Sequence, residues 1–281
     1  MSSYRFCRTD DIELLVDALN RCWLPYFPDE GPVTAATFKR SIRDLQVWCS
    51  SCMVAFSGAD PIGVLIGAKR PSGTLIHRIA VHPDHLRQGH GRHLLDSLGS
   101  KLAILGPPRI MVEVPQALEH AAGLLRAGGF GQEVVLTNYV RPGDGIEVPE
   151  MTARFLIPVT VDDLAANSLL GEDYPPTCWE RSVETLMARK EEIAGLAVAS
   201  DERIEAFLLY IKDGEILALR SLVEDGGARL KQLLSRLLAT GIGTPRFPKV
   251  HPGEISKELL ETLGFRPSGR HVLYATTARS A

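Results

Sequence analysis

The sequence predicts a mixed α/β fold made of two tandem copies of one domain, the second of them degenerate. The length of 281 residues is about twice that of a usual single domain. Short strand patterns alternate with helix patterns, and their order in the first half returns in the second. We therefore expect domains at residues 1–142 and 150–281, joined near the Pro- and Gly-containing segment RPGDGIEVPE.

Each predicted copy begins its sheet with a β-hairpin. Residues 51–67 read as two apolar strands around a Gly/Asp/Pro turn, and residues 194–210 repeat this pattern. Residues 53–66 align with 196–209 without a gap. A further strand follows each hairpin, LIHRIAV in the first half and EILALRSLV in the second. The matching order indicates a duplicated unit.

The remaining elements also occur in pairs. Helices with leucines at three-to-four spacing follow the third strands, and short strands ending at Pro115 and Pro252 come next. A helix then closes on Gly-Phe in each half, and Tyr139 and Tyr274 follow these helices at the same distance. The preserved order and spacing indicate that both copies have the same plan.

Composition excludes several classes of protein. Apolar residues make up 45% of the chain, and the formal net charge is -3, which provides no general attraction for nucleic acid or anionic lipid. Neither a signal peptide nor an apolar run of membrane-spanning length is recognisable. The five cysteines, which include a CSSC pair, suit buried reduced thiols. We expect a cytoplasmic protein without nucleic-acid or membrane partners, and oligomer formation stays open.

The stretch VHPDHLRQGHGRH connects a buried strand to a helix. Glycines at this junction let the backbone approach a ligand, and the N–H groups of the first helical turn attract an anion. Arg87 and Arg92 flank the turn and supply positive charge. This combination favours a pyrophosphate. A dinucleotide fingerprint is excluded because Leu94 stands where its third glycine is needed, and G-K-[ST] is missing for a P-loop.

A metal site is the alternative interpretation of the same stretch. It contains two H-x-x-H pairs, but no Cys or Asp spacing completes a zinc signature. We therefore expect no metal and mostly solvated histidines, with His90 as the one that reaches phosphate. A metal-binding protein built on this cluster stays open as a rival.

The string RIAVHPDHLRQGHGRHLL resembles the central motif of the GNAT superfamily of N-acetyltransferases. The resemblance covers the first half, and it implies acetyl-CoA as cosubstrate. It also implies that the strand pairs with pantetheine and that the turn cradles pyrophosphate. The residues in these two roles are Ile79, Ala80, Val81, Arg87, Gln88, Gly89, His90, Gly91 and Arg92. One departure is Leu86, where the superfamily usually has Gln or Arg.

Acyl transfer to an amine needs a base, and His77 is the first candidate. An unperturbed histidine titrates near neutral pH, and strand alternation predicts that His77 shares a face with Ile79 and Val81. The arylalkylamine N-acetyltransferases, members of the same superfamily, look similar at this place. Glu113 is the second candidate. The superfamily's usual tyrosine and helix-starting asparagine are replaced by Leu125 and Leu118, so Tyr139, a histidine or water is left as the acid.

The segment WLPYFPDE is the candidate acceptor site. Three aromatic residues followed by two acids suit the apolar body and cationic head of an amine. The candidates are Trp23, Tyr26, Phe27, Asp29 and Glu30. A proline-rich connection whose aromatic residues pack into the core is the alternative.

The second half keeps the order of elements but not the turn. Glu224 and Asp225 stand where a pyrophosphate would arrive, and they would repel it. The tandem plan resembles that of the mycothiol synthases. We expect an N-acetyltransferase that acts on a small amine by direct attack in a ternary complex. A non-catalytic acyl-CoA sensor or scaffold is the alternative.

Overall fold

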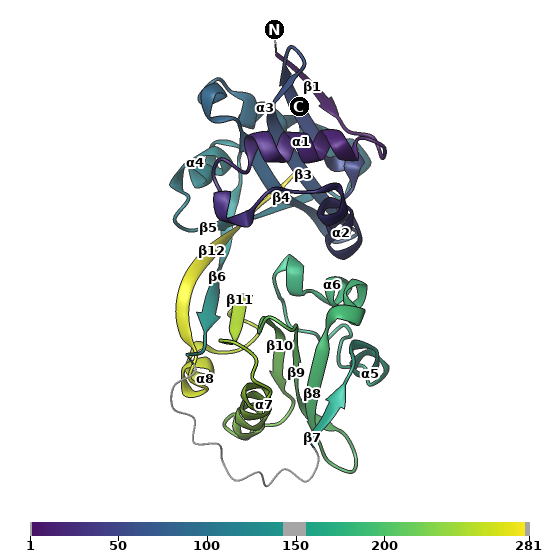
Figure 1. Ribbon diagram of the computed structural model, residues 1–281, viewed down its shortest axis with the longest axis vertical. Coiled ribbons are helices and arrows are strands. Elements are labelled where there is room, and N and C mark those ends of the chain that lie inside the picture. The colour runs from purple at the N-terminus through teal and green to yellow at the C-terminus, as the bar shows by residue number, and fades with distance from the viewer. Residues whose placement is uncertain (1, 143–155, 279–281) are drawn as a thin grey trace. The chain divides into compact units, whose positions relative to one another are not determined.

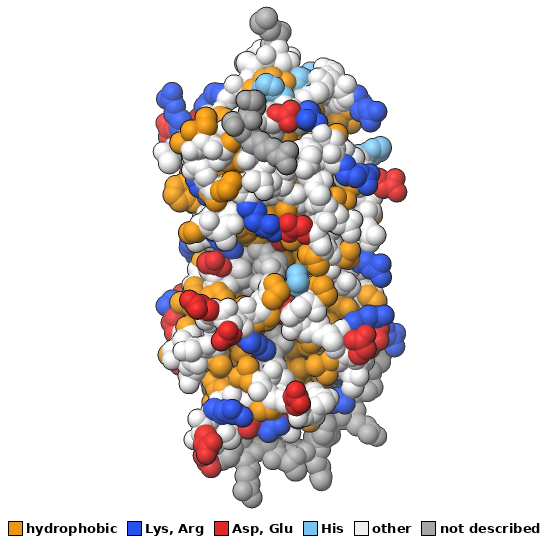
Figure 2. All heavy atoms as spheres, turned by 180° about the vertical axis from the view of Figure 1, so that it is seen from behind, with side chains coloured by type: hydrophobic (Ala, Val, Ile, Leu, Met, Phe, Trp, Pro, Cys, Tyr) orange, Lys and Arg blue, Asp and Glu red, His pale blue; other side chains and the backbone are white. Residues whose placement is uncertain are grey.

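The computed structural model describes residues 2–142 and 156–278, which form two compact units. Unit 1 contains Met1–Val134 and Val272–Ala281, and unit 2 contains Val135–His271. Both repeat the same series of elements (Figure 1), as the sequence predicts. None of the helices in the described part combines the length and apolar character needed to cross a membrane. Side chains of both charge signs are interspersed on the face shown in Figure 2.

The elements of the first half form a central sheet with helices on both faces. The strands are β1 (Ser2–Phe6), β2 (Met53–Ser57), β3 (Asp60–Arg70), β4 (Gly73–Val81), β5 (Arg109–Pro115) and β6 (Gly131–Val140). The helices are α1 (Ile12–Cys22), α2 (Ala35–Leu45), α3 (His90–Leu105) and α4 (Glu119–Ala127). Strands β1 to β4 pair in antiparallel order, and β5 joins β4 in parallel.

The leucine spacing of α3 determines which side of the sheet it covers. Leu94, Leu95, Leu98 and Leu102 pack into one cluster with Met53, Leu65 and Ile76 of the sheet. Helix α1 buries Leu15 and Leu19, and Leu19 lies with Ile66 of β3 on the other face.

The elements of the second half follow in the same order. They are β7 (Leu156–Val159), α5 (Val161–Ala166), α6 (Val183–Ala188), β8 (Ala194–Ala199), β9 (Ile204–Tyr210), β10 (Ile216–Ser221), α7 (Ala228–Ala239), β11 (Arg246–Val250), α8 (Lys257–Thr262) and β12 (Arg266–Thr277). Strands β10, β9, β8 and β7 form one sheet in that order. Helix α7 buries Leu230, Leu233, Leu234 and Leu237 in the core of unit 2.

Unit 1 is made of two separate segments of the chain, whereas unit 2 and each of the predicted domains are a single segment. The end of β12, from Val272, belongs to unit 1, whereas β6 enters unit 2 at Val135. Strand β12 is accordingly the neighbour of both β5 and β6. Of the predicted linker, residues 143–150 lie outside the described residues. Its first residue, Arg141, is buried and donates a hydrogen bond of 2.8 Å to the carbonyl oxygen of Leu263.

All five cysteines are buried, and none of them forms a disulfide within the described residues. Burial raises the pKa of the thiols of Cys49 and Cys52, the two cysteines of the CSSC pair. Thiols held in the protonated form are poor nucleophiles and metal ligands. The pair therefore contributes apolar packing beside β2.

Candidate functional site in the first half

The candidate site starts from a β-bulge in strand β4. Leu65 pairs with Ile79 and Ile66 with Arg78, but the next residue of β3, Gly67, pairs with Ile76. Strand β4 therefore carries one extra residue, His77, opposite this step. A bulge redirects the side chains around it and occurs often beside functional sites.

The bulge changes the face on which His77 lies. Ile76 belongs to the core cluster on the α3 side, and Ile79 packs against it. His77 and Arg78 instead line a cavity on the α1 side, together with Leu19. The prediction that His77 shares a face with Ile79 and Val81 is therefore wrong, because simple alternation does not hold across an extra residue.

The cavity beside His77 has a volume of about 160 Å³. Its wall contains residues of α1, of the following loop and of α2, which are Leu19, Glu30, Gly31, Pro32, Val33, Thr37, Phe38 and Ser41, together with Ile66, His77 and Arg78 of the sheet. Glu30 and His77, predicted separately as acceptor and base residues, thus line one cavity.

The other residues of the predicted acceptor segment have different positions. The indole Nε1 of Trp23 donates to the Glu30 carboxylate at 3.1 Å, and the ring stacks on Phe27 with centroids 4.3 Å apart. Asp29 is exposed. The hydroxyl of Tyr26 donates a hydrogen bond of 2.8 Å to the carbonyl oxygen of Val81. Of this segment, only Glu30 lines the cavity.

Strand β4 has an open edge toward β5. The two strands pair only at Thr74 with Ile110 and Leu75 with Met111. On the other side, the N–H of His82 donates to Ile62 of β3. Antiparallel pairing alternates, so the backbone groups of Ala80 also face β3 and those of Ile79 and Val81 face the open edge. Of the three predicted pantetheine residues, Ile79 and Val81 can therefore offer backbone hydrogen bonds there.

The glycine turn joins this edge to helix α3. Gly89 caps the helix in the left-handed region at φ 86°, and a Cβ atom placed on it would meet nothing within 4 Å. The first N–H groups of a helix have no acceptor within it. An anion therefore finds space and donors at Gly89. At Gly91 a Cβ would lie 3.1 Å from Leu124 of α4, so this glycine serves helix packing.

The polar side chains of the turn are either exposed or already bonded to other groups of the protein. Arg87 and Gln88 are exposed beside Gly89. The guanidinium of Arg92 forms an ion pair with Asp96 at 2.8 Å and bonds to the carbonyl oxygen of Ala127. Arg87 is therefore the guanidinium that is positioned to approach an anion at the turn.

His90 is buried rather than solvated. Its side chain is 5% exposed, and its Nδ1 lies 2.6 Å from the hydroxyl of Tyr4. Burial lowers the pKa of His90, and the neighbouring His85 and His93 lower it further. Its Nε2 is buried without a partner in the described part of the chain. The imidazole is neutral at pH 7, so it adds no positive charge to the turn.

The histidines of this stretch do not converge on one point. The ring centroids of His82 and His85 are 6.0 Å apart, and those of His85 and His90 are 6.2 Å apart. Within residues 2–142 and 156–278, they form no group of three donors close enough for one ion. This geometry does not favour the metal-binding rival.

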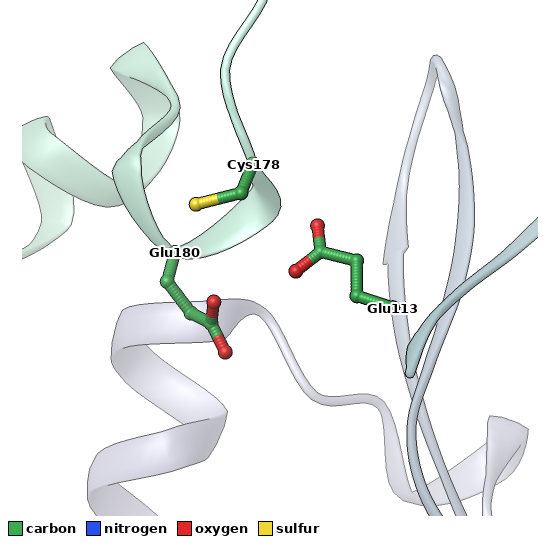
Figure 3. A group of neighbouring side chains, drawn as sticks. All are labelled: Glu113, Cys178 and Glu180. Atoms are coloured by element: carbon green, nitrogen blue, oxygen red, sulfur yellow. The ribbon is translucent and has the colours of Figure 1, made fainter. Parts of the chain in front are cut away.

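The remaining predicted catalytic residues lie on later strands. Glu113 is half-buried on β5 (Figure 3). Tyr139 belongs to β6, in the part assigned to unit 2, and its ring is buried in the core of that unit. Leu125, at the superfamily's tyrosine position, is also buried.

The corresponding turn of the second half is occupied by its own carboxylate. Gly227 caps α7 at φ 83°, as Gly89 caps α3. The N–H groups of Gly227 and Arg229 both donate to the carboxylate of Asp225 at 2.9 Å. Burial opposes ionisation of Asp225, but the bonds from Arg229 and Gly227 outweigh it and lower the pKa. The carboxylate of Asp225 thus fills the position that an anion would take at this turn. The sequence predicted only that the acidic residues would repel a pyrophosphate.

The strand edge of the second half is also occupied. Glu215, the residue before β10, forms an isolated parallel bridge with Arg246 of β11. Arg181, from the short helix η4 (Trp179–Arg181) drawn in Figure 3 with Cys178 and Glu180, donates to the carbonyl oxygens of Leu217 and Lys249 at 3.2 and 3.0 Å. A buried ion pair with Glu254 at 2.6 Å holds the guanidinium. The sequence shows no pattern that predicts this contact.

Comparison with known proteins assigns the first half. Residues 12–130 match the model of the acetyltransferase (GNAT) family. The chain is 36% identical over 72 residues to the ribosomal protein bS18-alanine N-acetyltransferase of Escherichia coli K12. This match covers 26% of the chain and 49% of the relative, so the chain spans about half the length of the curated relatives it matches.

Solved structures extend the likeness to both halves. A tandem GNAT protein from the clavulanic acid biosynthesis pathway aligns over 100% of both chains with a TM-score of 0.67 and 15% identity. A GCN5-related N-acetyltransferase from Sphaerobacter thermophilus aligns over 99% of this chain and 96% of its own with a TM-score of 0.64 and 13% identity. At these identities the likeness concerns the fold. Residues 12–130 therefore resemble the GNAT family of acetyltransferases, and the chain as a whole has the fold of tandem GNAT proteins.

Proposed function

We propose that the protein is an acetyl-CoA-dependent N-acetyltransferase, which moves an acetyl group to the primary amine of a small molecule by direct attack in a ternary complex. The observation that carries the proposal is the continuity of three features along β4. The glycine turn lies at one end, the open edge at Ile79 and Val81 follows, and the cavity of His77 comes next.

The proposed cosubstrate site is in the first half alone. The pyrophosphate would bind at Gly89 and the first N–H groups of α3, with Arg87 beside it. The pantetheine arm would bond to Ile79 and Val81. In the second half, Asp225 and Arg181 occupy the corresponding positions. One acetyl-CoA per chain is therefore part of the proposal.

His77 is the proposed base. The acceptor amine in the cavity would give a proton to its imidazole, directly or through water, and attack the carbonyl carbon of the thioester. The N–C bond forms as the C–S bond breaks, and the thiolate of coenzyme A is protonated from solvent. Glu113 is the second candidate for the base. A buried Tyr139 in the core of unit 2 gives no support to its role as the acid.

The size of the cavity supports a small acceptor. At about 160 Å³ it is smaller than the cavities of roughly 300–1,000 Å³ that hold drug-sized ligands. The bS18-alanine relative acts on an alanine of a ribosomal protein, and a cavity of this size would admit only the first residue of such a chain. A cytoplasmic location completes the proposal, because five buried cysteines that form no disulfide in the described part of the chain suit a reducing compartment.

Calorimetric titration with coenzyme A tests the binding site. We expect one site per chain, and at least about tenfold weaker binding in Gln88→Glu, because the new carboxylate would face the phosphates. Gln132→Glu, the same change at an exposed position of β6, should bind as the wild type does. Unchanged binding in Gln88→Glu, or two sites per chain, would contradict the assignment.

Thiol release from acetyl-CoA over an amine panel tests the activity. His77→Gln should lower kcat by at least about 100-fold while leaving coenzyme A binding unchanged, since a positioned base contributes about 10²–10⁴-fold. Glu113→Gln is the comparison for the second candidate. Coenzyme A binding without turnover of any amine would favour the acyl-CoA sensor instead.

A further inference from the structure

The charges in the cavity of His77 occur as a pair. The guanidinium of Arg78 lies 2.9 Å from the carboxylate of Glu30, and both residues line the cavity. The side chains of Arg78 and Glu30 are 23% and 41% exposed, so the pair is open to exchange with a ligand. The other residues of the wall are apolar, apart from the hydroxyls of Thr37 and Ser41, the imidazole of His77 and backbone groups.

The indole of Trp23 contacts both members of this pair. Its indole donates to Glu30, and the guanidinium of Arg78 lies 5.2 Å from the centroid of its ring. A cation over the face of an indole is attracted to it. Both charged groups therefore keep their positions when a ligand separates them, because each has a further contact with Trp23.

A paired cation and anion discriminate between classes of amine. An acceptor that carries only positive charge would bind Glu30 through its ammonium. This would place the ammonium next to the guanidinium of Arg78, and the two positive charges would repel each other. An acceptor that carries an ammonium and a carboxylate would exchange the internal pair for two pairs of its own. Guanidinium and carboxylate form strong, directional bonds of this kind. The cavity volume fits one small molecule of this class.

Resting on the proposed function, we propose that the acceptor is a small amino acid, whose carboxylate binds Arg78 and whose ammonium binds Glu30. The ammonium loses one proton to His77, and the neutral amine then attacks the thioester carbon. The C–S bond breaks, the second proton leaves the nitrogen for solvent, and the products are an N-acetyl amino acid and coenzyme A.

Matched acceptors test this class of substrate. Each L-amino acid with a side chain up to the size of leucine is compared with its amide and its decarboxylated amine by thiol release. We expect kcat/KM for the preferred amino acid to exceed that of its two analogues by about 10- to 100-fold, because each lacks the charged partner of Arg78. Comparable rates for all three would overturn the proposal.

Variants of Arg78 separate recognition from folding. Arg78→Gln should remove the preference for the amino acid, raise kcat/KM for the decarboxylated amine because the repelling charge is gone, and bind coenzyme A as the wild type does. Arg78→Lys should restore part of the preference. Arg40→Gln, at an exposed position of α2, is the control. A preference that survives in Arg78→Gln would overturn the assignment.

The outcome also distinguishes this proposal from the function on which it rests. If coenzyme A binds and the plain amines or a peptide N-terminus are acetylated in preference to amino acids, the acceptor class is wrong and the acetyltransferase assignment stands. If coenzyme A does not bind and no acceptor releases thiol, the proposed function itself fails.

Discussion

The hydroxyl of Tyr26 donates a hydrogen bond of 2.8 Å to the carbonyl oxygen of Val81. This carbonyl faces the open edge of β4, where a pantetheine arm would bind. The loop after α1 therefore covers one end of the proposed cosubstrate site. Burial raises the pKa of the Tyr26 phenol, so it stays a hydrogen-bond donor at neutral pH.

Removing this hydroxyl should strengthen coenzyme A binding. In Tyr26→Phe, the carbonyl of Val81 no longer has an internal partner that a ligand must displace. The net contribution of one hydrogen bond, about 0.5–1.5 kcal/mol, corresponds to a two- to tenfold lower Kd. Calorimetry measures the change, with Tyr210→Phe in unit 2 as the control. Weaker binding in Tyr26→Phe would mean that the phenol contacts the ligand.

Breaking the buried ion pair of unit 2 should be costly. Arg181→Met leaves the carboxylate of Glu254 buried without its partner, and we expect a loss of about 3–5 kcal/mol in the free energy of unfolding. The double variant Arg181→Met with Glu254→Leu should recover most of it, because no charge is then left unpaired. Urea unfolding of both proteins checks this. Equal losses in the two would show that packing, not charge, dominates.

The carboxylate of Asp225, two residues before the N-cap Gly227, should stabilise the first turn of α7. Asp225→Ala removes the acceptor of two backbone N–H groups, and we expect it to lower the free energy of unfolding by about 1–2 kcal/mol. Asp225→Asn keeps an acceptor oxygen and should cost less. Thermal unfolding compares the two variants. If both behave as the wild type does, the carboxylate does not stabilise the turn.

His271 should make the protein less stable in mild acid. Burial lowers its pKa from 6.5 to about 4, and Lys249 contributes to the shift. Between these values the unfolded state takes up a proton that the folded state does not. The contribution of this group to the free energy of unfolding is therefore fully present above pH 6.5. It is lost as the pH decreases to about 4, which lowers the free energy of unfolding by about 2–3 kcal/mol.

The pH dependence of a variant isolates this contribution. In His271→Gln the free energy of unfolding should decrease less between pH 6.5 and 4 than in the wild type. His120→Gln, at an exposed position of α4, is the matched control and should follow the wild type. Parallel curves for His271→Gln and the wild type would refute the assignment.

Local patterns were sufficient to predict the order of elements, the duplication and the strand–turn–helix motif. Strands and helices differ in the spacing of their apolar residues, and Gly89 is needed where the chain enters α3 with positive φ. The loss of the glycine motif in the second half was also recognisable from the sequence, because acidic residues stand at the corresponding positions.

Contacts between distant residues decided the rest. The bulge at His77 depends on the pairing of β4 with β3, and the cavity depends on Glu30 of the α1–α2 connection meeting that strand. Arg181 occupies the second strand edge through partners 36 and 73 residues away. The sequence by itself determined which elements form and where the glycine turn leads into helix α3. The tertiary structure decided which side chains meet, because register and packing join residues whose separation along the chain carries no local signal.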